Sequence, residues 1–129
     1  MIRILLIAIA VLQSGLSIAQ TQAEMTLDAR KKLEKAEGEL NRLSDQIVEE
    51  YRDDTVFIRN FRASQKLWLQ FRKTELLMKY PQRDPSYYGS SFSMCVNLFL
   101  EELTRERIRK LTAWIEPDEE GDMCAGSAR

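Results

Sequence analysis

The chain has 129 residues and nearly balanced charge, with 19 basic and 20 acidic side chains. This balance argues against nucleic acid as the main partner, because phosphate binding requires a clustered basic excess. Histidine is absent, which removes the commonest general base and the commonest metal ligand. Two cysteines cannot form a four-thiolate zinc site, and no glycine-rich phosphate loop is present. We therefore expect no enzyme, no metal site and no cofactor.

Residues 1–19 have the pattern of a cleaved secretory signal peptide. Arg3 supplies a positive charge, residues 4–12 are an apolar run, and residues 17–19 give the small-x-small pattern that signal peptidase reads. The apolar run is far shorter than the roughly 20 residues that span a bilayer, which argues against an anchor. We predict a periplasmic or secreted protein with no membrane span after cleavage. Its single domain, residues 20–129, keeps 18 basic and 20 acidic residues, a formal charge of −2.

The first predicted helix covers residues 22–51. Thr21 and Glu24 have the spacing of a capping box at its start. Apolar residues then recur three and four positions apart, which places them on one face of a helix. This stripe consists of Leu33, Ala36, Leu40, Leu43, Ile47 and Tyr51.

Two further helices are predicted over residues 55–80 and 91–115. The segment "RDDT" separates the first two helices, and Asp53, Asp54 or Thr55 can cap the second. Short connections make neighbouring helices antiparallel, so the sequence predicts an all-α, three-helix up-down-up bundle followed by a tail over residues 116–129. The stripes of the second and third helices are Phe57, Phe61, Ser64, Trp68, Phe71, Glu75 and Met78, and Phe92, Val96, Leu100, Leu103, Arg107, Leu111 and Trp114.

Two charged side chains, Glu75 and Arg107, interrupt these stripes. Counting from the turn places them roughly 18 Å apart at 1.5 Å per residue, too far for an ion pair. We expect Glu75 to face the N-terminal end of the third helix, where backbone N–H groups lack acceptors. Arg107 is expected beside Ser64 and Gln65. We interpret both charges as structural.

Two segments are candidates for contact with a partner protein. Tyr87 and Tyr88 lie in the turn beside Gly89, and exposed tyrosines give contact area at small entropic cost. Packing over the open end of the bundle is the alternative for these two residues. The acidic stretch after the third helix has nothing apolar to raise a carboxyl pKa, so we interpret it as solvated rather than catalytic. Its acidic residues are Glu116, Asp118, Glu119, Glu120 and Asp122.

The two cysteines are expected to form one disulfide in an oxidising compartment. The third helix rises roughly 30 Å from Cys95 to Ile115, and an extended tail can return roughly 30 Å to Cys124. This span is just sufficient if the tail runs back along the bundle. Such a bond would contribute about 3–4 kcal/mol. A bond between two chains is the alternative.

Several segments together resemble the LprI-like lysozyme inhibitor family of small, exported, helical bacterial envelope proteins. They are "TQAEM", "KAEGELN", "SQKLWLQFRKTE", "YYGSSFSMC", "ELTRERIRKL" and "EGDMCAGS", and they extend from about Thr21 to Ser127. The resemblance implies that Trp68, Arg72, Glu75, Thr104, Arg107 and Leu111 match recurring marks of the family.

The chain departs from this family at two cysteine positions. Many members carry cysteines where Asp28 stands and near Leu76, and neither is present here. A family disulfide through those positions therefore cannot form, and Cys124 in the tail is a candidate replacement.

The resemblance implies a protein partner, a wall-lytic lysozyme, whose binding would protect the bacterial wall. Because lysozymes are commonly basic, an acidic complement would steer their association, and the acidic stretch is the best candidate patch. The alternative function is a non-inhibitory adaptor or structural protein of the envelope that binds another protein.

Overall fold

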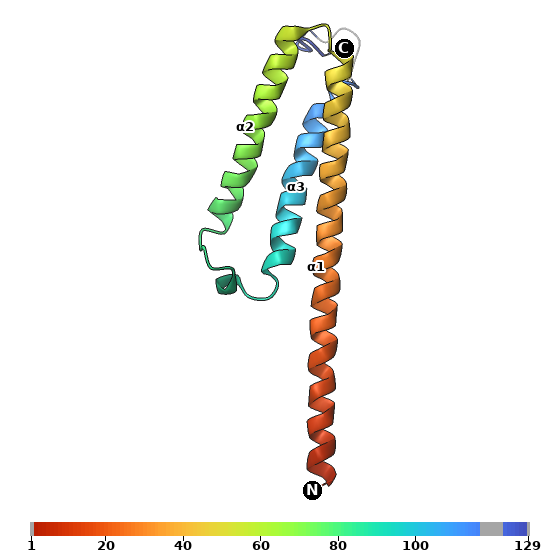
Figure 1. Cartoon of the computed structure of the whole chain (residues 1–129), viewed down its shortest axis with the longest axis vertical. Coiled ribbons are helices and arrows are strands. Elements are labelled where there is room, and N and C mark those ends of the chain that lie inside the picture. Colours follow the sequence, from red (N-terminus) through yellow and green to blue (C-terminus); the bar gives the residue numbers. More distant parts are fainter. Residues whose placement is uncertain (1, 117–122, 129) are drawn as a thin grey trace.

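The computed structural model describes residues 2–116 and 123–128, with side chains from Gln20 onward. These residues form three α-helices, a short 3₁₀ helix and no strand, which confirms the all-α prediction. The long helices run up, down and up (Figure 1). The second and third lie close to their predicted ranges, whereas α1 begins about 20 residues before the predicted start at residue 22. The elements are α1 (Ile2–Glu50), α2 (Thr55–Lys79), η1 (Pro85–Tyr88) and α3 (Phe92–Thr112).

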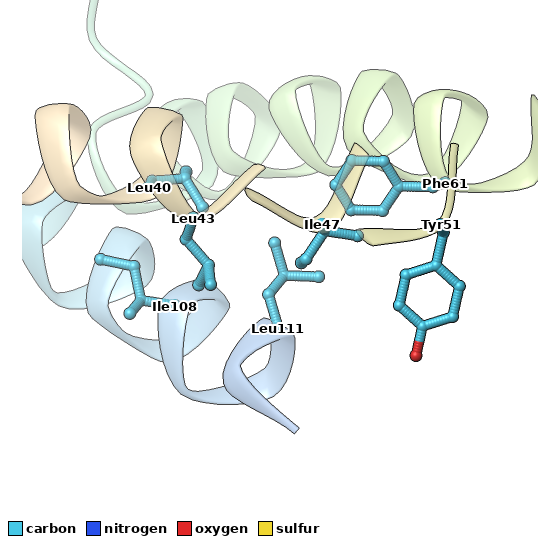
Figure 2. Packing of buried hydrophobic residues seen from close by; sticks show 7 residues of the cluster. All are labelled: Leu40, Leu43, Ile47, Tyr51, Phe61, Ile108 and Leu111. Carbon is cyan, nitrogen blue, oxygen red and sulfur yellow. The ribbon is translucent and has the colours of Figure 1, made fainter. Parts of the chain in front are cut away.

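The core is built mainly from the faces of α1 and α3 that meet along the length of α3 (Figure 1). Figure 2 shows Ile108 and Leu111 of α3 pointing toward Leu43 and Ile47 of α1. Burial of such side chains is the main favourable term in folding. All six residues of the predicted α1 stripe are buried: Leu33, Ala36, Leu40, Leu43, Ile47 and Tyr51.

Tyr51 joins all three helices at the corner where α1 ends. Its side chain is fully buried, and its hydroxyl donates a 2.9 Å hydrogen bond to the carbonyl oxygen of Trp114, just beyond α3. Its ring stacks on Phe57 of α2 with the ring centroids 4.0 Å apart. Asp54, one of the predicted caps, accepts a 2.8 Å hydrogen bond from the backbone N–H of Phe57 and so starts α2. The corner is therefore fixed by packing and by polar contacts.

The predicted core face of α2 is buried only in its first half. Phe61 is buried and Trp68 packs against the core, but Phe71 is 49% exposed and Met78 71% exposed. Figure 1 shows the reason, because α2 leans away from α1 and α3 with increasing distance from the corner. Phe71 and Met78 therefore lie outside the core, although both belong to the predicted stripe of this helix.

The predicted disulfide between Cys95 and Cys124 is absent from the structure. Cys95 lies in the first turn of α3, whereas residues 123–128 lie at the opposite end of the bundle, beside the α1–α2 connection (Figure 1). A 21-residue helix is roughly 30 Å long, so this placement keeps the two sulfur atoms apart. Residues 123–128 therefore do not lie beside the start of α3, where that prediction required Cys124 to be.

α1 is much longer than its neighbours, and its N-terminal part extends beyond the rest of the bundle (Figure 1). Among the side chains described from Gln20 onward, the first buried one is Ala29, which lies near the start of α3 together with Met94 and Leu98. Within the described part of the chain, no helix is long and apolar enough to cross a membrane. Signal cleavage after Ala19 stays a prediction, and it would leave the packed part of α1 intact.

Replacing Ile47 by alanine is expected to lower the free energy of unfolding by about 2–4 kcal/mol, because the lost atoms leave a cavity in the core. Leu67→Ala is the matched control. Leu67 is 65% exposed, so its loss should change stability by less than about 0.5 kcal/mol. Urea denaturation of both variants measures the difference. Equal losses of stability would contradict this assignment of the core.

Candidate functional site

The connection between α2 and α3, residues 80–91, is held together by four aromatic rings. Tyr88 lies at the centre of this aromatic loop, with ring centroids 5.2 Å from Tyr80, 5.1 Å from Tyr87 and 5.0 Å from Phe92. Tyr80 and Phe92 also meet edge to face at 5.2 Å, which links the end of α2 to the start of α3. Such aromatic pairs contribute about 0.5–1.5 kcal/mol beyond their buried area.

Hydrogen bonds fix the backbone of the aromatic loop. The hydroxyl oxygen of Tyr88 accepts a 2.8 Å hydrogen bond from the backbone N–H of Gln82. One carboxylate oxygen of Asp84 accepts hydrogen bonds from the backbone N–H of Ser86 at 2.9 Å and from its hydroxyl at 2.7 Å. The bonds from Ser86 lower the pKa of Asp84 below its usual value. The loop then reaches α3 through Gly89, whose φ of +79° suits a residue without Cβ.

Most residues of this fixed loop are exposed, and two of them, Tyr87 and Arg83, carry large side chains suited to contact with a partner. Tyr87 is 71% exposed, although its ring touches that of Tyr88. Arg83 is exposed and makes no ion pair with any residue that the structure describes. Tyr88 is half-buried and packs inside the loop, so the two neighbouring tyrosines occupy different positions.

The sequence reasoning predicted a turn in this segment but missed Arg83 and the Asp84 side chain that closes the turn. The available signal was the segment "RDPS", because aspartate followed by proline and serine is typical of a turn closed by the aspartate side chain. Asp84 and Pro85 start η1 in this way.

A second cluster of predicted residues joins the three helices in the middle of the bundle. Arg72 of α2 donates hydrogen bonds to Glu37 of α1 at 2.9 Å and to Thr104 of α3 at 3.0 Å. Its guanidinium carbon also lies 5.1 Å from the ring centroid of Trp68, a cation–π distance. Thr104 is fully buried, so these contacts satisfy a polar group inside the core.

The two charges on the predicted stripes behave differently. Arg107 lies beside Ser64 and Gln65, as expected, and donates a 2.8 Å hydrogen bond to each. Glu75 is half-buried and makes no hydrogen bond or ion pair with the described residues. The expected contact between Glu75 and the first turn of α3 is therefore absent. Ser91, at the N-cap of α3, makes no side-chain capping bond either.

Glu116, the described residue of the acidic stretch, lies far from the aromatic loop. It is exposed just beyond the C-terminal end of α3, while the loop precedes the N-terminal end of the same helix. The helix separates Glu116 from the loop by roughly 30 Å. The other predicted acidic residues, Asp118, Glu119, Glu120 and Asp122, lie outside the described residues.

The described residues hold no group of three or more His, Cys, Asp or Glu side chains placed to bind a metal ion. The side chains that stand out are instead those suited to contact with another protein. Tyrosine and arginine are enriched among the residues that dominate binding energy at interfaces. The aromatic loop, with Tyr87 and Arg83 exposed, is therefore the candidate functional site.

Replacing Asp84 by alanine should loosen the aromatic loop while leaving the core intact. Ser86 loses the acceptor of two hydrogen bonds, so we expect faster amide hydrogen exchange over residues 82–89. Asp53→Ala is the control, because Asp53 is exposed beside α2 and lies outside the loop. In the parent protein the cap is present at neutral pH and is lost as the pH falls through the lowered pKa of Asp84. Unchanged exchange in the Asp84 variant would contradict this account.

Comparison with known proteins places the chain in a family. A family model described as lysozyme inhibitor LprI matches residues 15–111, which include all of α2, the aromatic loop and nearly all of α3. No curated protein and no solved structure gives a significant match. Because the match covers well over half of the chain, the protein belongs to the LprI family of lysozyme inhibitors.

Proposed function

We propose that the protein is an exported inhibitor that binds a lysozyme through the aromatic loop. The observation that carries this proposal is the exposure of Tyr87 and Arg83 on a loop whose backbone is fixed by its own contacts. Membership of the LprI family supports the choice of a lysozyme as the partner.

A fixed loop is suited to inhibition because binding then orders few new groups. Each flexible side chain immobilised on binding costs about 0.5–1.5 kcal/mol. A loop that is already ordered in the free protein has fewer groups to immobilise, so its binding loses less conformational entropy. Tight complexes of enzymes with protein inhibitors commonly show little backbone movement. The internal contacts of Tyr88 and Asp84 give the aromatic loop this property.

The two exposed side chains fit the chemistry of a sugar-cleaving site. Glycoside hydrolases generally carry two carboxyl groups that flank the bond to be cleaved. Arg83 can pair with such a carboxylate through two parallel N–H donors. The ring of Tyr87 can lie where a sugar ring of the wall polymer would bind. An inserted loop would therefore exclude the substrate without undergoing any reaction itself.

Export would place the inhibitor where wall-lytic enzymes act, in the periplasm or outside the cell. The predicted cleavage after Ala19 would remove a part of α1 that extends beyond the bundle (Figure 1). The buried stripe of α1 begins ten positions later, at Ala29, and would remain. The domain that presents the loop is thus preserved in the processed protein.

The adaptor function also has support from one observation. Leu67, Phe71 and Met78 form an exposed apolar face on the part of α2 that leans away from the bundle. Exposed apolar patches of this kind often mark contacts with other proteins. This face is separate from the tip of the aromatic loop, so variants can distinguish the two functions.

Replacing Tyr87 or Arg83 by alanine should weaken inhibition of a lysozyme by about ten- to a hundredfold, the loss typical of a dominant contact residue. Raised salt should weaken the parent inhibitor but affect the Arg83 variant less, because salt screens the charge pair. The assay titrates the purified protein against lysozymes of several classes and follows wall lysis.

Matched controls are available on α2. Phe71→Ala removes another exposed aromatic ring, and Arg59→Ala removes another exposed guanidinium, so neither should change inhibition more than about twofold. Inhibition lost in the Phe71 variant but retained in the Tyr87 variant would move the contact to α2. Failure of the parent protein to inhibit any lysozyme class would contradict the proposed function and favour the adaptor.

A further inference from the structure

A cavity of about 660 Å³ lies between α2 and α3, close to the corner where α1 ends. Its apolar floor includes Phe57, Phe61 and Trp114, whose rings also contact one another. Arg107 and Lys110 of α3 bring two positive charges to the same cavity. The volume falls within the range of roughly 300–1,000 Å³ that is usual for small-molecule sites. The cavity is far from the aromatic loop and takes no part in the proposed function.

The guanidinium of Arg107 is the feature of this cavity that needs an explanation. It is partly withdrawn from water, and this burial lowers its pKa below the usual value for arginine. Its hydrogen bonds go only to neutral oxygens, those of Gln65 and Ser64. Within the described residues, neither Arg107 nor Lys110 has a carboxylate within ion-pair distance.

Two other partly buried arginines of this bundle are each paired with a carboxylate. Arg72 reaches the carboxylate of Glu37 at 2.9 Å, and Arg105 reaches that of Glu39 at 2.7 Å. A partly buried charge is costly unless it is paired, and both of these arginines are paired across helices. Arg107 is on the same helix as Arg105, but it faces a cavity whose lining also includes Asp54 and Ser127. No described carboxylate, that of Asp54 included, lies within ion-pair distance of Arg107.

We propose that this cavity binds a small organic anion that combines a flat ring with a carboxylate. The carboxylate would accept hydrogen bonds from Arg107, with Lys110 adding positive charge at the rim. The ring would lie against Phe57, Phe61 and Trp114, where offset or edge contacts between aromatic groups are favourable. The ligand thus supplies both a negative charge, which no described residue brings within ion-pair distance of Arg107, and apolar surface that the aromatic floor can cover.

The test uses 2-naphthoate as the probe, with its neutral analogue 2-naphthylmethanol for comparison. Titration of the purified protein is followed by calorimetry and by the NMR signal of the Trp114 indole. We expect saturable binding of the naphthoate that shifts this signal, and affinity lower by about tenfold or more for the uncharged alcohol, because a hydrogen-bonded charge pair is lost.

Three variants assign the binding to the cavity. R107Q should lower the affinity for naphthoate by about tenfold or more, whereas R109Q, the same change at an exposed position on α3, should leave it within about twofold. If R107Q does not fold, the N60W variant tests whether naphthoate binds in the cavity. This variant keeps Arg107 and its partners but places a larger side chain in the lining of the cavity. N60W should abolish binding.

Three results would overturn the proposal. The first is the absence of saturable naphthoate binding up to millimolar concentration. The second is binding that N60W leaves unchanged. The third is binding that a folded R107Q variant retains at the parent affinity. None of them bears on lysozyme inhibition, because Tyr87 and Arg83 lie at the opposite end of the bundle.

Discussion

The packing of α1 against α3 is the interaction on which the other features of the protein depend. It buries a continuous apolar stripe of α1 and fixes the position of α3 along the axis of α1 (Figures 1 and 2). Tyr51 closes the upper end of this interface by bonding to the carbonyl of Trp114. Since α3 begins at the aromatic loop and ends at the cavity, its position determines where both are presented.

The two ends of α3 are suited to different kinds of partner. At its start, the aromatic loop projects Tyr87 and Arg83 outward, which suits insertion into a cleft of another protein. At its end, an aromatic floor and Arg107 surround a hollow of small-molecule size. Between the ends, Arg72 and its partners join the three helices.

The sequence predicted those features that depend on local periodicity and on register. The α1 stripe is buried as predicted, because on a helix whose other faces are charged only the apolar face favours packing against a neighbouring helix. Arg107 lies beside Gln65, the position predicted by counting residues from the turn between the second and third helices. Phe71 was misplaced because an apolar stripe does not reveal whether a neighbouring helix covers it. The prediction of a disulfide at Cys95 was wrong because chain length alone does not determine at which end of the bundle residues 123–128 lie. Arg83 was missed because its exposure depends on how Asp84 closes the turn.

The central claim is that the aromatic loop is the surface that contacts the lysozyme. Amide hydrogen exchange, compared between the free protein and its stoichiometric complex with an inhibited lysozyme, tests this most directly. The account predicts slower exchange over residues 80–91 and little change over residues 51–61 at the corner. Protection confined to the corner or to the exposed face of α2, with the loop unchanged, would contradict it.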